Sequence, residues 1–124
     1  MKQTLGKAEK LKSRKLIGEL FTSGKSVKAY PLVAVYLPLD APNENTLFGV
    51  SVAKKRIRNA VDRNLVKRRV REAYRLHKET LLENEGLELA LMVLYLKGEV
   101  APFAEVEKSM QKLLVKLLEA KKSI

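Results

Sequence analysis

The chain has 124 residues, with 25 Lys and Arg against 14 Asp and Glu, so its formal net charge is +11. This length allows one domain with a packed core and is too short for two, and the strong positive charge favours an anionic partner, above all nucleic acid. The sequence has no cysteine, which excludes a disulfide framework and a thiolate metal site.

Two features of the chain argue against secretion and against membrane insertion. The N-terminal sequence is basic and lacks an apolar segment. The longest uncharged apolar run, Leu89 to Leu96, is too short to cross a bilayer. We therefore expect a soluble cytoplasmic protein. Residues 1–11 are polar and Lys-rich and predict a flexible basic N-terminus, followed by a single domain over residues 12–121.

The first predicted element is a short helix from Lys12 to Ser23. Ser13 suits its N-cap and Gly24 its C-cap. Four large apolar residues recur at helical spacing: Leu16, Ile17, Leu20 and Phe21. Phe21, at the end of the helix, fits either a core position or an exposed platform for a nucleic-acid base.

Two strands are expected next, Leu32 to Leu37 and Leu47 to Val52. They read LVAVYL and LFGVSV, and the intervening LDAPNENT contains turn-forming residues, so the pattern predicts a hairpin with a long loop. Alternation places Leu32, Ala34 and Tyr36 on one face of the first strand. Tyr36 can then be buried or lie on a binding face, and both possibilities remain open.

The second half of the chain predicts helix, strand and helix. A helix is expected from about Asn59 to Lys78, followed by a turn at Glu83 to Gly86. The strand Leu87 to Leu96 is apolar almost throughout, which predicts burial on both faces in the middle of a sheet. The last helix follows Pro102 and carries a core stripe of Phe103, Val106, Met110, Leu113, Leu114, Leu117 and Leu118. With one more strand near Tyr30, this order predicts an α+β fold with a mixed four-stranded sheet and about three helices.

The most informative stretch is the basic sequence from Lys54 to Arg71, KKRIRNAVDRNLVKRRVR. About half of its residues are Lys or Arg, and Asp62 is its only acid. On a helix from Asn59, the core-facing stripe would be Val66, Val70, Ala73, Tyr74 and His77. An arc of about 140° beside this stripe holds the basic and amide side chains Arg63, Lys67, Arg71, Asn64, Arg75 and Arg68.

This arc indicates a polyanion partner. Arg63, Lys67 and Arg71 follow one another at i, i+4 spacing and repel, a cost that a bound polyanion would offset. Arginine matches phosphate and can stack on a base, and the amide of Asn64 can both donate and accept. A membrane surface is disfavoured, since the apolar residues opposite the charge are needed for the core. Nucleic acid is the better partner.

The sequence offers no catalytic site of its own. Its one histidine, His77, lies on the predicted buried stripe near a helix end, which favours a structural role over that of a general base. There is no P-loop, no zinc-protease motif and no carboxylate cluster of the two-metal nuclease type. A chain of this kind is more readily the cofactor of a catalyst than the catalyst itself.

The segment FGVSVAKKRIRNAVDRNLVKRRVREAYR resembles the signature of the bacterial ribonuclease P protein subunit. Further similar segments are FTSGKS at the end of the first helix, the YPLVAVY strand, the buried strand before a Lys-Gly loop, and EVEKSMQKLL in the last helix. The resemblance extends from about Leu11 to Leu118. It implies an α/β sandwich with a left-handed βαβ crossover, whereas general rules favour a right-handed one.

The resemblance also implies a function. In that family the protein joins a catalytic RNA, and the holoenzyme removes the 5′ leader from precursor tRNA by phosphodiester hydrolysis. Mg²⁺ bound mainly by the RNA serves catalysis, and the protein holds the single-stranded leader in a groove between the sheet and the helices. The partners expected are therefore the RNA subunit and precursor tRNA, with no membrane and no DNA.

Individual site residues follow from the same resemblance. The RNA-contacting residues would be Lys54, Lys55, Arg58, Asn59, Arg63, Asn64, Lys67, Arg68 and Arg71. Phe21 and Tyr36 would stack on leader bases. The chain departs from the family pattern at Ile17, where many members have an aromatic residue, and at Leu65, which replaces an arginine. The loss at Leu65 removes roughly one phosphate contact unless Arg69 or Arg58 takes over its role.

Two other classes of function fit the charge and the fold class. A structural ribosomal or RNA-assembly protein would bind RNA without dependence on a 5′ leader. A DNA-binding regulator would prefer duplex DNA, but the chain offers neither helix-turn-helix spacing nor a clear dimer interface.

Overall fold

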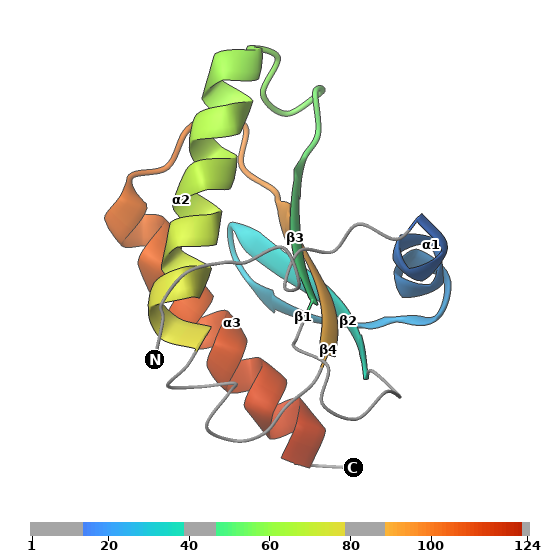
Figure 1. Cartoon of the computed structure of the whole chain (residues 1–124). Helices are drawn as coiled ribbons and strands as arrows, with labels where there is room; N and C mark the ends of the chain where they lie inside the picture. Colours follow the sequence, from blue (N-terminus) through green and yellow to red (C-terminus); the bar gives the residue numbers. More distant parts are fainter. Residues whose placement is uncertain (1–13, 39–46, 79–88, 123–124) are drawn as a thin grey trace.

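The computed structural model describes residues 14–38, 47–78 and 89–122, which form three helices and one four-stranded sheet (Figure 1). The elements are α1 (Arg14–Ser23), β1 (Lys25–Ala29), β2 (Leu32–Pro38), β3 (Leu47–Val52), α2 (Ala60–Lys78), β4 (Leu89–Tyr95) and α3 (Phe103–Lys122). The predicted N-terminal segment, the N-cap Ser13, the loop LDAPNENT and the turn at Glu83 to Gly86 lie outside the described residues. The predicted α+β fold class is confirmed.

The strands lie in the order β1-β2-β4-β3. Strand β2 pairs antiparallel with both β1 and β4, and β3 pairs parallel with β4. The central position predicted for the apolar strand is confirmed, because β4 lies between two neighbours and six of its seven residues are buried. The extra strand expected near Tyr30 is β1, which ends at Ala29.

The hairpin predicted between the second and third strands is wrong. Strands β2 and β3 do not pair, because β4 lies between them. The physical reason is the apolar content of β4, which must be covered on both faces and by a neighbour on each edge. The resulting β3–α2–β4 unit is a parallel crossover; its left-handed sense stays a prediction.

Helices α2 and α3 cover one face of the sheet and form the main core with it (Figure 1). Side chains of β2 and β4 alternate into this core in matched register, as in the pair Tyr36 and Leu91. From α2 come the buried Val66, Val70, Ala73 and Tyr74, and from α3 come Val106, Met110, Leu113, Leu114 and Leu117. Both predicted core stripes are confirmed, except that His77, Phe103 and Leu118 are only half-buried.

Helix α1 packs on the opposite face of the sheet. It buries Leu20 against Ala90 and Met92, and Leu16 and Ile17 pack around them. The helix ends where Gly24 N–H donates to the carbonyl of Leu20 at 2.9 Å. A short helix of this kind covers only part of the sheet, so the face beside it is less fully buried than the face under α2 and α3.

The part of the chain that the structure describes holds no helix that is both long enough and apolar enough to cross a membrane.

Candidate RNA interface

Helix α2 begins at a cap formed by Asn59. The side-chain oxygen of Asn59 accepts a hydrogen bond from Val61 N–H at 2.8 Å, and its carbonyl accepts one from Arg63 N–H at 3.0 Å. Asn59 was predicted as an RNA contact. In the structure its side chain satisfies a free N–H of the first helical turn, which is what an N-cap residue does.

Three arginines of the basic stretch are held by backbone carbonyls. Arg56 Nη1 donates to Leu96 O at 2.7 Å, which ties the segment after β3 to the end of β4. Arg63 Nη1 donates to the carbonyls of Ile57 and Arg58 at 2.9 and 2.8 Å. Arg69 Nη1 donates to Ala101 O at 2.6 Å and so joins α2 to the loop before α3. These contacts fix the shape of the segment that presents the remaining cations.

The remaining cations lie free at the surface. None of them forms a hydrogen bond or ion pair through its side chain with the described residues, and all are exposed except Lys67, which is half-buried. We call them the α2 basic face: Lys54, Lys55, Arg58, Lys67, Arg68 and Arg71. Asn64, also exposed, lies among them.

The acids of α2 leave this face positive. Glu72 pairs with Arg75, and the hydrogen bond from that guanidinium holds the pKa of the Glu72 carboxyl below its usual value. Arg75, which the sequence placed in the basic arc, therefore has its charge offset by a neighbour. Asp62, the only acid between Lys54 and Arg71, lies in the first turn, where a carboxylate favours the positive end of the helix dipole.

The structure also bears on the substitution at Leu65. This side chain is half-buried, so it provides packing where the family pattern has a cation. Of the two arginines considered as replacements, Arg69 already donates to Ala101 O, whereas Arg58 is exposed and its guanidinium makes no contact within the described residues. Arg58 is therefore the better candidate.

The two aromatic residues predicted to stack on bases have different surroundings. Phe21 is 55% exposed on α1, so its ring is accessible to a ligand. Tyr36 is only 5% exposed and packs in the core under α2 and α3. The prediction of base stacking by Tyr36 is thus wrong, because its side chain points to the covered face of the sheet.

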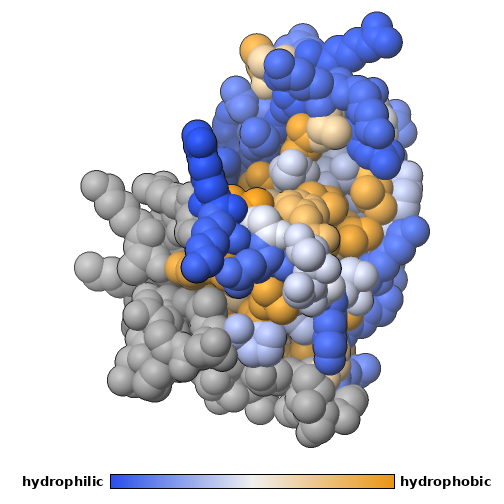
Figure 2. All heavy atoms as spheres, turned by 90° about the vertical axis from the view of Figure 1, so that its right-hand side faces the viewer, coloured by the Kyte–Doolittle hydropathy of each residue, from blue (hydrophilic) through white to orange (hydrophobic). Residues whose placement is uncertain are grey.

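The face beside α1 combines apolar and charged surface. Half-buried Val33, Val35 and Leu94 point to this side of the sheet, since Val33 lies opposite Leu94 and Val35 packs with α1. Figure 2 views this side and shows apolar atoms in its middle with hydrophilic residues above them. Ile17, the other departure from the family pattern, is half-buried on α1 and packs against the cluster that joins α1 to the sheet.

One exposed aromatic residue was not predicted as a site residue. Tyr30 is 61% exposed in the turn between β1 and β2. The available signal was its position before Pro31, since the residue before a proline favours extended or turn conformations, and turns lie at the surface.

His77 links α2 to α3, as expected of a structural histidine. Its Nε2 lies 3.0 Å from Glu107 Oε2 and 3.4 Å from the side-chain nitrogen of Gln111. Within the described ranges, no group of three His, Cys, Asp or Glu side chains is placed to hold a metal ion.

Comparison with known proteins gives a consistent result. A family model described as Ribonuclease P matches residues 5–118. The chain is 41% identical over 117 residues to the ribonuclease P protein component of Porphyromonas gingivalis, covering 91% of this chain and 85% of that protein. It is 38% identical over 109 residues to the protein of the same name from Chlorobium phaeobacteroides, covering 77% of this chain and 73% of that protein.

Solved structures agree on the fold. The RNase P protein of Staphylococcus aureus matches with a TM-score of 0.75 at 24% identity, over 90% of this chain and 96% of that one. The RNase P protein of Thermotoga maritima matches with a TM-score of 0.72 at 25% identity, over 87% of this chain and 96% of that one. The family match over nearly the whole chain shows that this protein belongs to the ribonuclease P protein family.

Proposed function

We propose that this protein is the protein subunit of a ribonuclease P, working in the cytoplasm, and that it assists a catalytic RNA in removing the 5′ leader from precursor tRNA. Family membership supports the proposal, and the α2 basic face is the observation that carries it. This face has six cations, Lys54, Lys55, Arg58, Lys67, Arg68 and Arg71, whose side chains bind no acid among the described residues.

The α2 basic face would bind the phosphate backbone of RNA. Each cation that neutralises a phosphate releases a condensed counterion, which gives affinity at low salt without any dependence on base sequence. Lys67, Arg68 and Arg71 occupy consecutive turns of one helix and can follow a backbone. Asn64, exposed among them, adds an amide that can contact a base edge or a ribose hydroxyl.

The leader would bind on the other side of the sheet, beside α1. There Phe21 presents a largely exposed ring on α1, the helix that packs on the half-buried apolar surface of the sheet. An unpaired base can stack on such a ring, which holds a single strand with little dependence on sequence. Mature tRNA has no leader, so this contact would favour precursor over product.

In this proposal the chemistry belongs to the RNA. As the family resemblance implies, we assign Mg²⁺ mainly to the RNA subunit. There the ion would stabilise the charge that develops on the reacting phosphate. The protein's own residues would bind and position the two RNA molecules.

The test is leader release from a precursor tRNA at low Mg²⁺ concentration. Three reactions are compared: a bacterial ribonuclease P RNA alone, this protein alone, and both together. We expect cleavage at the mature 5′ end in the mixture only. Cleavage by the protein alone would indicate a protein nuclease. If the folded protein binds the RNA and gives no stimulation, the proposal is wrong and an RNA-assembly role becomes the better explanation.

A further inference from the structure

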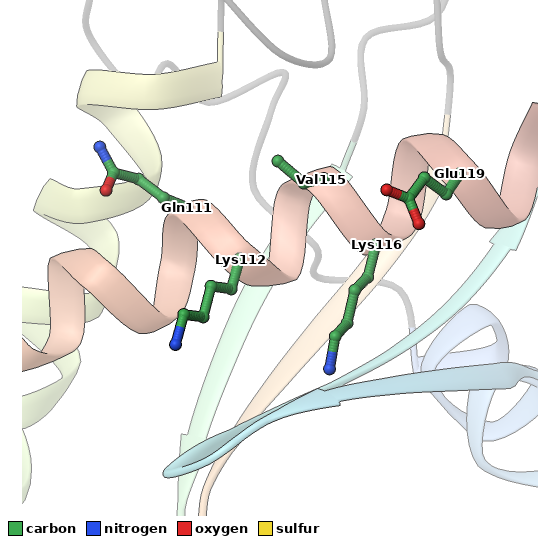
Figure 3. Close-up of a pocket in the computed structure, with 5 residues that line it drawn as sticks. All are labelled: Gln111, Lys112, Val115, Lys116 and Glu119. Atoms are coloured by element: carbon green, nitrogen blue, oxygen red, sulfur yellow. The ribbon is translucent and has the colours of Figure 1, made fainter.

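A second row of cations lies on α3, away from the α2 basic face. Lys108, Lys112 and Lys116 recur at every fourth residue, and all three are exposed. Like charges at this spacing repel and destabilise a helix, so the row has an energetic cost in the free protein. Figure 3 shows Lys112 and Lys116 extending from the same side of α3 toward β1 and β2, while Gln111 and Val115 point elsewhere.

Nearby acids offset only part of this charge. Glu105, one turn before the row, accepts hydrogen bonds from Lys97 at 2.9 and 3.2 Å, so its charge is already matched. Glu119 borders the row at its other end and lines the same shallow hollow as Lys112 and Lys116. One carboxylate against three lysines leaves the surface positive.

An exposed aromatic residue, Tyr30, lies on a turn that is fixed to α3 beside this row. Ser109 Oγ donates to the carbonyl of Tyr30 at 3.0 Å, and Lys116 Nζ donates to the carbonyl of Lys28. These two bonds hold the turn between β1 and β2 against the helix, while the side chain of Tyr30 is 61% exposed. An aromatic ring next to cations is the combination that binds single-stranded nucleic acid, by stacking and by phosphate neutralisation.

This surface and the α2 basic face lie on different helices, over different strands of the sheet. Helix α3 packs on β1 and β2, whereas α2 packs on β3, and β1 and β3 are the two edges of the sheet. With neighbouring strands about 4.8 Å apart, the two edges are about 14 Å apart, before the outward side chains are counted. The two surfaces therefore lie toward opposite edges of the sheet.

We propose that Lys108, Lys112, Lys116 and Tyr30 form a second RNA-binding surface, which we call the α3 basic surface, and that it holds a segment of the RNA subunit. The lysines bind backbone phosphates and an unpaired base stacks on Tyr30. The inference rests on the proposed function. The RNA subunit is the favoured occupant because the repulsion along α3 is present at all times, and a permanent partner offsets it throughout, whereas a substrate does so only while bound.

The lysines are tested with the double variant Lys108→Ala, Lys112→Ala. Both side chains are exposed, and neither forms a hydrogen bond or ion pair with the described residues, so the fold should be kept. We expect weaker binding of the RNA subunit, with the slope of log affinity against log salt concentration reduced by about 1.4 to 1.8. The matched control is Lys108→Arg, Lys112→Arg, which keeps both charges and should keep the wild-type slope.

The ring is tested with Tyr30→Ala, which we expect to weaken binding of the RNA subunit about fivefold or more. Tyr30→Phe retains the stacking face and should bind within about twofold of wild type. Equal losses for Tyr30→Ala and Tyr30→Phe would exclude stacking and overturn this part of the inference.

A second measurement distinguishes the RNA subunit from the substrate. Affinity of the assembled holoenzyme for precursor tRNA is measured at a protein concentration that saturates the RNA subunit. A loss of affinity seen only in this assay would place the substrate on the α3 basic surface and overturn the proposal. Wild-type affinity in both assays would also overturn it. Lys67→Ala is the reference: if it weakens RNA binding while the α3 variants do not, the inference fails and the proposed function stands.

Discussion

The ring of Phe48 stacks on the ring of Tyr74, with centroids 4.0 Å apart and planes 7° from parallel. Phe48 lies on β3 and Tyr74 on α2, and both are almost completely buried. The pair therefore fixes the helix that carries the α2 basic face to an edge strand of the sheet. The stability of the fold and the position of the α2 basic face therefore both depend on this contact.

Replacing Phe48 with alanine should lower the free energy of unfolding by about 3–5 kcal/mol, because it removes a buried ring and leaves a cavity beneath α2. Urea denaturation followed by circular dichroism measures the change. Val61→Ala is the control, since Val61 is 73% exposed and its truncation should change stability by no more than about 0.5 kcal/mol. Similar losses for the two variants would show that the stacked pair contributes little.

Two glycines of the α1 region should respond oppositely to alanine. A Cβ at Gly24 would lie 2.3 Å from Leu20 O and 2.8 Å from Val35 Cγ1, so Gly24→Ala should destabilise by about 1–3 kcal/mol. A Cβ at Gly18, inside α1, would meet nothing within 4 Å. Gly18→Ala should then stabilise by about 0.5–1 kcal/mol, because it removes backbone entropy from the unfolded chain. Thermal unfolding of the two variants checks both signs. Stabilisation by Gly24→Ala would contradict the close packing at Gly24, and destabilisation by Gly18→Ala would contradict the open space at Gly18.

Lys67→Ala should flatten the salt dependence of RNA affinity. Loss of one phosphate contact reduces the slope by about 0.9 for a duplex and about 0.7 for a single strand. The control is Arg75→Ala on the same helix, where Glu72 already offsets the charge that is removed. Binding titrations over a salt series compare the two, and an unchanged slope for Lys67→Ala would remove that residue from the interface.

Phe21→Ala should lower the affinity of the holoenzyme for leader-bearing precursor by about 1–3 kcal/mol, the usual value for one stacked base. Affinity for mature tRNA should stay unchanged, since the product has no leader. Because Phe21 is 55% exposed, unfolding measurements on the same variant should show only a small loss. Equal losses for precursor and product would assign Phe21 to packing alone.

The buried phenol of Tyr95 should make the protein sensitive to alkali. Burial raises the pKa of Tyr95 above its usual value. The folded state then holds this proton more tightly than the unfolded chain, so the free energy of unfolding falls as the pH rises above about 10. The pKa of Lys97, raised by its hydrogen bond to Glu105, acts in the same direction.

Tyr95→Phe separates the phenol from the other titrating groups. The hydroxyl donates to Glu99 O at 2.5 Å and accepts from Ala101 N–H at 2.9 Å, so its loss should cost about 1 kcal/mol or more at neutral pH. Above pH 10 the variant should lose less stability than the wild type, and the two should converge. Parallel curves in urea titrations from pH 8 to 11 would contradict the raised pKa.

The basic helix could be predicted from the sequence because its signal is local. Residues four apart share a helix face, so the buried stripe of Val66, Val70 and Tyr74 and the cations beside it follow from spacing alone. Spacing does not show which of these cations remain free of hydrogen bonds within the protein. Arg56, Arg63 and Arg69 donate to carbonyls brought near by turns and by distant strands, and no spacing rule identifies those acceptors.

The strand pairing and the face of Tyr36 depended on information that local patterns lack. A turn-rich loop between two strands favours a hairpin, yet β4, from much later in the chain, separates them. Alternation in β2 gives two faces but does not say which one α3 will cover. Tyr36 pairs with Leu91 on the covered face, and a shift of one residue would have exposed it.

The central place of β4 also orders events during synthesis. Strand β3 and the basic residues 54–71 leave the ribosome before β4, the strand with which β3 pairs. Until residue 95 has emerged, the sheet cannot close, and contacts this distant in sequence form slowly. Until then the cationic segment lacks the completed sheet against which α2 packs. We expect selective assembly with a partner RNA to follow completion of the sheet.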